Sequence, residues 1–178
     1  NLRLARETSG CPPEIAERVQ ALEGQGKTVI LLNDGQRVLG LFAVADTVKE
    51  SSCEAIAQLH ALGVKTVMLT GDNPHTARAI AAQVGIDEAR GNQLPADKHA
   101  AVQALSRQGV AGMVGDGIND APALAAADIG FAMGAMGTDT AIETADVALM
   151  DDDLGKIPAF VRLSKQTYAL LVQNISIA

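Results

Sequence analysis

Residues 64–73, VKTVMLTGDN, and residues 110–120, VAGMVGDGIND, follow one pattern, in which a short apolar run leads into glycine and aspartate. From Asp46 onward, such apolar runs alternate with helix-like segments. Apolar strands that are separated by helices indicate a parallel sheet buried on both faces. The sequence therefore predicts an α/β, Rossmann-like fold in which helices flank a parallel sheet.

The expected elements follow from this alternation. Gly85 is expected to cap one of the helices, because glycine tolerates the left-handed conformation at a helix end. Helices are expected over 49–62, 74–84, 96–107, 120–126 and about 138–143, and a last one begins near Leu154. Strands are expected over 64–69, 110–114, 128–132 and 145–149, with a short one near 89–91.

The first 45 residues show a different pattern of helix and strand signals. Pro12-Pro13-Glu14 predicts a helix start, since proline is tolerated in the first helical turn, and Gly24 and Gly26 end that helix. Residues 27–33 and 37–45 are expected to form two strands joined by a hairpin turn at Asp34-Gly35. We therefore expect a small hairpin and helix ahead of the segments that form the parallel sheet.

Composition excludes some classes of function. The chain has 178 residues, a formal net charge of −7 and 2% aromatic residues. An acidic surface repels phosphate backbones, and a chain with one tyrosine and no tryptophan offers almost no platform on which bases stack. We expect no nucleic-acid partner, and the acidic balance suits a domain that faces the cytosol.

Cysteine and histidine give no metal-binding or disulfide pattern. Cys11 and Cys53 are far apart and belong to no CxxC pair, so we expect neither a disulfide framework nor a structural zinc site. His60, His75 and His99 are scattered among helical segments without ligand spacing.

The acidic loops suggest a divalent cation. In a parallel sheet, ligands bind at the carboxyl ends of the strands, and Asp72, Asp116 and Asp120 all follow strands. Two carboxylates on one side of a turn repel each other unless a cation lies near them. Mg²⁺ fits, because it takes one or two carboxylates together with phosphate and water. The alternative is that these aspartates are only turn and N-cap residues.

Two further side chains suit a phosphoryl group. The hydroxyl of Thr70 ends its strand at the same edge, where the N–H groups of a following helix can hold phosphate oxygens. Lys98 lies at a helix start, which normally favours acidic residues, so a role at a phosphoryl group explains its position. The alternatives are an ordinary strand threonine and a solvated surface lysine.

Taken together, these residues resemble the haloacid-dehalogenase-type phosphotransferases, and in detail one branch of them, the P-type ATPases. Thr70-Gly71-Asp72-Asn73 looks like the TGDN motif of that branch, and residues 115–124, GDGINDAPAL, look like its GDGxNDxPAL hinge motif. Pro95-Ala96-Asp97-Lys98 resembles its P-x-D-K segment. The resemblance extends from about Lys27 to the end of the chain, and two long motifs in the correct order make it specific.

The resemblance implies roles for single residues. It makes Asp116 a Mg²⁺ ligand with Asp120 close behind it, and it places Thr70, Lys98 and Asn119 at the phosphoryl group. The residues that it would bring near the nucleotide are Asp46, Gly71, Asp72, Asn73 and Gly117. Lys49 stands where the family often has arginine, which puts a nucleotide contact there in doubt. The implied cofactors are Mg²⁺ and ATP.

One departure from the family is decisive. The chain contains no Asp-Lys-Thr-Gly-Thr segment, which in the family supplies the phosphorylated aspartate. We therefore expect a part of a larger pump: residues 1–45 as the end of a nucleotide-binding domain, 46–165 as part of the phosphorylation domain, and 166–178 as the start of a transmembrane helix. Its expected partners are the rest of the pump, with nucleotide-binding, actuator and transmembrane domains, at the cytoplasmic face of the cell (inner) membrane. On its own the chain is expected to be inactive.

The transported ion is suggested by residues 138–153 and by Gln173-Asn174-Ile175, which are similar to the heavy-metal branch and closer to its zinc, cadmium and lead members than to its copper members. Two other functions remain open. One is a free-standing phosphatase of the same superfamily, which would need its own nucleophilic aspartate, and Asp34 in a turn is the only candidate near a first strand. The other is a non-catalytic binding or regulatory module.

Overall fold

The computed structural model describes residues 12–35, 37–44, 48–115, 118–134, 139–151 and 153–177. It divides into two compact units. Unit 1 comprises Asn1–Lys49 and Thr66–Asn92, and unit 2 comprises Glu50–Lys65 and Gln93–Ala178. The domain boundaries expected at residues 45 and 165 remain predictions.

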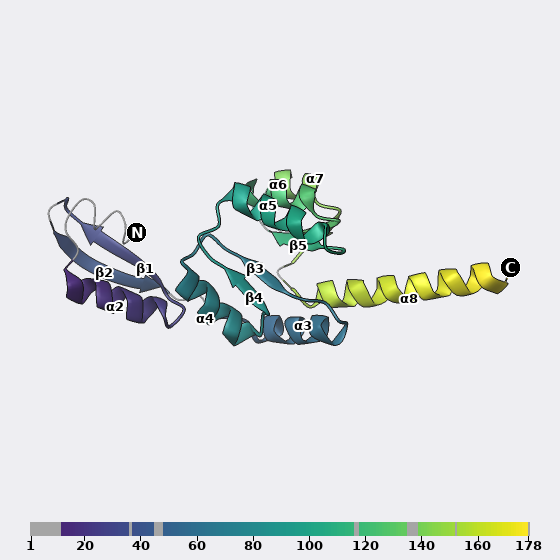
Figure 1. Ribbon diagram of the computed structural model, residues 1–178, viewed down its shortest axis with the longest axis horizontal. Coiled ribbons are helices and arrows are strands. Elements are labelled where there is room, and N and C mark those ends of the chain that lie inside the picture. Colours follow the sequence, from purple (N-terminus) through teal and green to yellow (C-terminus); the bar gives the residue numbers. More distant parts are fainter. Residues whose placement is uncertain are drawn as a thin grey trace. The chain divides into compact units, whose positions relative to one another are not determined.

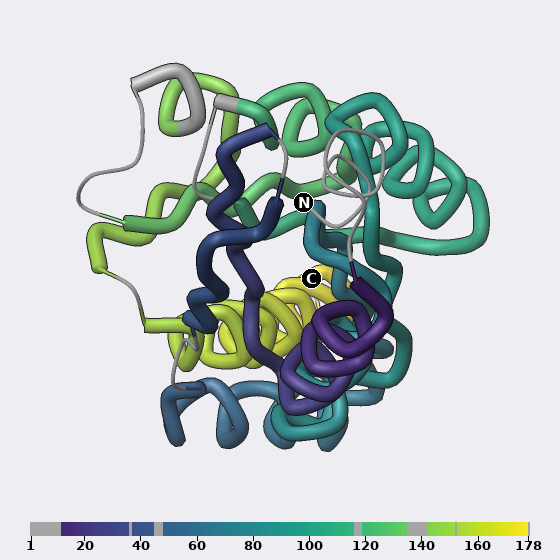
Figure 2. The backbone as a smooth tube through the Cα atoms, turned by 90° about the vertical axis from the view of Figure 1, so that its left-hand side faces the viewer, coloured from purple at the N-terminus to yellow at the C-terminus, as the bar shows by residue number. Residues whose placement is uncertain are grey.

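Unit 1 begins with the expected helix and hairpin (Figures 1 and 2). Helix α2 spans Pro13–Glu23 and lies beside the antiparallel pair of β1, Thr28–Asn33, and β2, Val38–Val44. Val19 of α2 is almost fully buried. The turn forms at Asp34-Gly35, where the Asp34 carboxylate accepts the Arg37 N–H at 2.8 Å. The expected helix, the two strands and the turn between them are confirmed.

The rest of unit 1 is a β-α-β element. Strands β3, Val67–Leu69, and β4, Glu88–Arg90, pair in parallel across helix α4, Pro74–Val84. Gly85 ends α4 in the left-handed conformation, as expected. The buried Thr76 hydroxyl donates to the Lys27 carbonyl at 3.4 Å, which ties α4 to the segment before the hairpin.

Unit 2 contains a three-stranded parallel sheet in the order β5-β6-β7. The expected α/β class, with parallel strands and flanking helices, is confirmed. Its strands are β5, Gly112–Gly115, β6, Ile129–Met133, and β7, Val147–Leu149. Its helices are α3, Glu50–Ala61, α5, Pro95–Ser106, the 3-10 turn η1, Ile118–Asp120, α6, Ala121–Ala126, α7, Asp139–Thr144, and α8, Lys156–Ile177.

The core of unit 2 lies on both faces of β6, because successive side chains of a strand point to opposite faces. Ala132 packs with Leu124 of α6 on one side. Phe131 packs with Leu149 and Ile157 on the other. Its ring also meets that of Phe160 edge to face, with centroids 5.4 Å apart.

An aspartate precedes the second strand of each of the three parallel pairs that the described residues form. Asp87 accepts the Thr66 N–H at 2.7 Å, Asp128 accepts the Ala111 N–H at 2.8 Å, and Asp146 accepts the Gly130 N–H at 2.8 Å. Each bond lies one residue before the first paired residues of the two strands. These carboxylates therefore fix the register at the amino ends of the strands, opposite to the ends where ligands bind.

Helix α8 begins near the expected residue and continues past Tyr168 (Figure 1). Ile157 and Pro158 are buried, whereas the residues from Arg162 to Ile177 are exposed. Within the described ranges, none of the helices combines the length and apolar character needed to cross a bilayer.

Candidate functional site

Three of the predicted site residues, Asp46, Asp116 and Gly117, lie outside the residues that the structure describes. The others fall in both units. Thr70, Gly71, Asp72 and Asn73 belong to unit 1, and Lys98, Asn119 and Asp120 belong to unit 2. The expected convergence of Thr70, Lys98 and Asn119 with Asp116 therefore stays a prediction.

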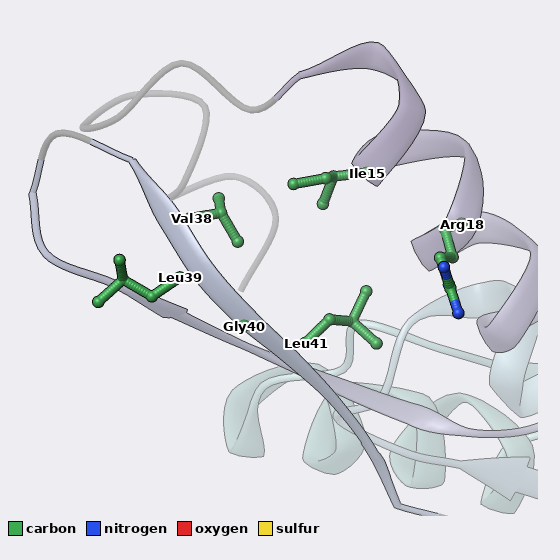
Figure 3. A pocket seen from close by; sticks show the side chains of 6 residues that line it. All are labelled: Ile15, Arg18, Val38, Leu39, Gly40 and Leu41. Carbon is green, nitrogen blue, oxygen red and sulfur yellow. The ribbon is translucent and has the colours of Figure 1, made fainter.

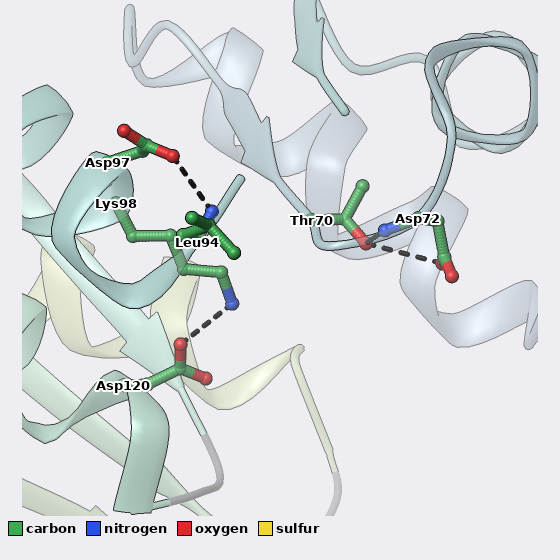
Figure 4. A network of polar contacts seen from close by, with 6 residues as sticks. All are labelled: Thr70, Asp72, Leu94, Asp97, Lys98 and Asp120. Atoms are coloured by element: carbon green, nitrogen blue, oxygen red, sulfur yellow. Dashed lines mark hydrogen bonds and ion pairs between the residues drawn. The ribbon is translucent and has the colours of Figure 1, made fainter. Parts of the chain in front are cut away.

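Within unit 2, the structure brings Lys98 and Asp120 together (Figure 4). Lys98 lies in the first turn of α5, and its Nζ donates to Asp120 Oδ1 at 2.8 Å. The two side chains are only 18% and 13% exposed. An ion pair so well covered is not the solvated surface lysine that the sequence left open. It places a positive charge beside the loop that follows β5.

The first turn of α5 explains how a lysine is tolerated there. The neighbouring Asp97 carboxylate accepts the Leu94 N–H at 3.0 Å, so it meets the preference of a helix start for negative charge (Figure 4). Lys98 is then available to the loop in which Asp120 lies. Asn119 is exposed on the same 3-10 turn as Asp120.

Gly115 makes room for Asp120. A Cβ atom at Gly115 would lie 2.8 Å from Asp120 Cβ and 3.2 Å from Asp120 Oδ2. A side chain at the end of β5 would therefore push the Asp120 carboxylate aside. Gly115 therefore lets an acidic side chain approach the end of the strand.

Within unit 1, the loop after β3 is held by its own side chains. The Thr70 hydroxyl donates to Asp72 Oδ2 and accepts the Asp72 N–H, both at 3.2 Å (Figure 4). Asn73 caps α4, because its Oδ1 accepts the N–H groups of His75 and Thr76 at 2.9 and 3.0 Å. The Asn-Pro dipeptide at a helix start is the signal for this cap, and sequence reasoning did not use it.

The donor set is compatible with Mg²⁺. Within the described ranges no three His, Cys, Asp or Glu residues gather into a possible metal site, and Asp116 is outside them. Asp120 supplies a hard carboxylate of which one oxygen is bonded to Lys98. This suits an ion that takes one or two carboxylates and completes its shell with phosphate and water.

A hollow of about 250 Å³ lies elsewhere in unit 1, between α2 and β2, and is lined by Ile15, Arg18 and residues 38–41. The Ile15 and Val38 side chains point into it and Leu39 points away (Figure 3). Its lining is mainly apolar and holds none of the predicted site residues, so we assign it no part in the chemistry.

Comparison with known proteins supports the motif analysis. The chain is 49% identical over 162 residues to a cadmium-transporting ATPase of Staphylococcus aureus and 53% identical over 164 residues to a probable cadmium-transporting ATPase of Listeria monocytogenes. These matches cover 90% and 91% of the chain but only 22% and 23% of the curated relatives.

Solved structures agree. A zinc-transporting PIB-type ATPase in the E2.Pi state superposes with a TM-score of 0.79 at 46% identity, over 94% of this chain and 28% of that chain. The catalytic domain of a CPx-ATPase gives a TM-score of 0.59 at 28% identity, over 70% of this chain and 48% of that chain. The expected resemblance to heavy-metal P-type ATPases is confirmed by these relatives.

The family model for haloacid dehalogenase-like hydrolases matches residues 1–128, a range that contains the loop after β3, Lys98 and Asp120. The chain belongs to the haloacid dehalogenase-like hydrolase family.

Proposed function

We propose that the chain is part of a P-type ATPase that exports a heavy-metal cation, Zn²⁺, Cd²⁺ or Pb²⁺, across the cell membrane. The Lys98–Asp120 ion pair carries this proposal, because it sets a covered positive charge at the carboxyl end of a parallel sheet. A phosphoryl group passing through this position is stabilised by such a charge. The chain's high identity to cadmium-transporting relatives supports the choice of ion.

In the proposed pump, each residue contributes to the handling of an aspartyl phosphate. Lys98 neutralises charge on the phosphoryl oxygens, and Asp120 holds the ammonium in place. Thr70 and Asn119 donate hydrogen bonds to the same group, and Asp116 ligates Mg²⁺. The nucleotide-facing set is Asp46, Gly71, Asp72, Asn73 and Gly117. Bound Mg²⁺ would neutralise charge on the transferred group, and the phosphorylated aspartate comes from a segment outside these 178 residues.

The remaining proposals concern the surroundings of the chain. Its partners are the nucleotide-binding, actuator and transmembrane parts of the same pump, together with the transported cation. It lies at the cytoplasmic face of the membrane, where ATP is available.

The test is ATP hydrolysis by the complete pump in proteoliposomes, measured with each cation in turn. Zn²⁺, Cd²⁺ or Pb²⁺ should stimulate the activity, and Lys98→Met and Asp116→Asn should abolish the phosphorylated intermediate. Stimulation by Cu⁺ alone would contradict the proposed ion. The isolated 178-residue chain should neither hydrolyse ATP nor take label from γ-labelled ATP, and steady hydrolysis of a phosphate monoester by it would favour the free-standing phosphatase instead.

A further inference from the structure

Two side chains in the first half of α8 hold this helix against α3. Arg162 Nη2 donates to Gln58 Oε1 at 3.0 Å. Lys165 Nζ donates to the Leu62 carbonyl at 2.8 Å. Both bonds lie inside unit 2 and join segments that are more than 100 residues apart in sequence.

The structure at the end of α3 explains why the Leu62 carbonyl accepts a hydrogen bond from a lysine. Gly63 takes a left-handed conformation with φ +75°, and the N–H groups of Gly63 and Val64 donate to the carbonyls of His60 and Leu59. In this glycine-based helix end, N–H groups of the following residues bond to carbonyls of the last turn. The Leu62 carbonyl lies at the negative end of the α3 dipole, which favours a cation such as the Lys165 ammonium.

The spacing of these residues makes a two-point contact. Arg162 and Lys165 are three residues apart, so their side chains share one face of α8. Their acceptors are the side chain of Gln58 in the last turns of α3 and the carbonyl of Leu62 just after its end. An apolar anchor precedes them on α8, where Ile157 and Pro158 are buried and Phe160 meets Phe131. Beyond Lys165, the described residues from Gln166 to Ile177 are all exposed.

We propose that Arg162 and Lys165 form a clamp, the α3–α8 clamp, that fixes the direction of the distal half of α8, residues 166–177, relative to α3. The distal half extends about 18 Å at 1.5 Å per residue. A helix anchored only near Phe160 would therefore swing widely at its far end. The proposal rests on the proposed function and on the expectation that residues 166–178 begin a transmembrane helix. It makes Arg162 and Lys165 positioning residues for coupling ATP hydrolysis to transport.

The clamp is tested first in the 178-residue chain, by residual dipolar couplings of the amides of α3 and α8. In the parent chain, both helices should fit one alignment tensor. In Arg162→Met/Lys165→Met the two helices should need different tensors, while thermal unfolding changes little because both side chains are exposed. The conservative variant Lys165→Arg, made in the parent chain, keeps a donor for the Leu62 carbonyl. Its two helices should still fit a single tensor. Lys156→Met, a control on the same helix that removes an exposed ion pair with Asp151, should leave it intact.

The second test measures coupling in the complete pump, as the stimulation of ATP hydrolysis by the transported cation. The double variant should lose about 2- to 30-fold of that stimulation while basal hydrolysis persists. The control Lys156→Met should behave as the parent. A single alignment tensor in the double variant, or unchanged stimulation, overturns the clamp. A parent pump without cation-stimulated hydrolysis contradicts the proposed function instead, and the dipolar couplings still decide whether the clamp exists.

Discussion

Lys98 and Asp120 lie 22 residues apart in sequence and form a largely covered ion pair, with 2.8 Å between Nζ and Oδ1. Lys98 comes from the start of α5, and Asp120 comes from the turn that joins β5 to α6. The pair therefore connects the entry of one helix with the carboxyl end of the following strand. The contribution of this pair to stability and its proposed role at a phosphoryl group can be measured separately.

A double-mutant cycle with Lys98→Met and Asp120→Asn should give a coupling energy of about 1.5–3 kcal/mol, because hydrogen bonds between charged and poorly hydrated groups are strong. Urea unfolding of the chain measures it. The exposed pair of Lys156 and Asp151 serves as the control and should give a clearly smaller coupling energy, because solvent screens exposed charges. Equal coupling energies for the two pairs would show that burial of the Lys98 pair adds nothing.

Gly115→Ala should destabilise unit 2 by about 1–3 kcal/mol, because its Cβ would press on the Asp120 side chain. The same substitution at Gly112, in the same strand, would meet Ile129 and Phe131 only at 3.5 Å or more. Gly112→Ala should therefore be neutral or slightly stabilising. The unfolding midpoints of the two variants are compared with that of the parent chain. Similar losses of stability at both positions would contradict the close approach at Gly115.

Asp116→Asn should weaken Mg²⁺ binding to the isolated chain by at least about tenfold, since it removes a charged ligand. A titration followed by the amide signals of residues 118–120 measures the affinity. Asp128→Asn is the matched control, because Asp128 lies at the opposite, amino end of the same sheet and accepts the Ala111 N–H. Equal affinities for the parent and Asp116→Asn would remove Asp116 from the metal site.

Local sequence signals were sufficient for much of this fold. The left-handed cap at Gly85, the turn at Asp34-Gly35 and the parallel β5-β6-β7 sheet all follow from glycine placement and apolar alternation. Strand β3 is shorter than expected, at Val67–Leu69 instead of 64–69. Thr66 just before it is bonded to Asp87 instead, and a strand boundary of this kind depends on a distant residue.

The site was less accessible to sequence reasoning. The unusual lysine at a helix start pointed to Lys98, but only the folded chain shows that Asp120 is its partner. Asn73 was assigned to the nucleotide from its motif, and the structure shows its side chain capping α4. A motif records which residues occur together and does not separate those that bind a ligand from those that hold a loop. The nucleotide role of Asn73 remains a prediction.

The pKa of Asp151 lies below its ordinary value of 3.8, chiefly because the Lys156 side chain donates a hydrogen bond to the carboxylate. A lowered carboxyl pKa contributes stability above the unfolded-state pKa, and that contribution is lost as the pH falls through the folded-state pKa. Lys156→Met should raise the Asp151 pKa toward 3.8. A carbon-detected NMR titration of the carboxyl group checks this, and an unchanged pKa in the variant would exclude Lys156 as the cause. At neutral pH, the Asp151 carboxyl group should be ionised in both proteins.

Asp146→Ala should destabilise unit 2 by about 1–3 kcal/mol, because it leaves the buried Gly130 N–H without its carboxylate partner. The loss should appear mainly in hydrogen exchange of β6 and β7, since the Asp146 bond sets the register just before Phe131 meets Val147. Asp146→Asn keeps an acceptor oxygen and should lose less than half as much stability. Exchange in β5 should change less, because the separate carboxylate of Asp128 holds its pairing with β6. Uniformly faster exchange across all three strands would instead mean that Asp146 stabilises the unit as a whole and carries no particular control of register.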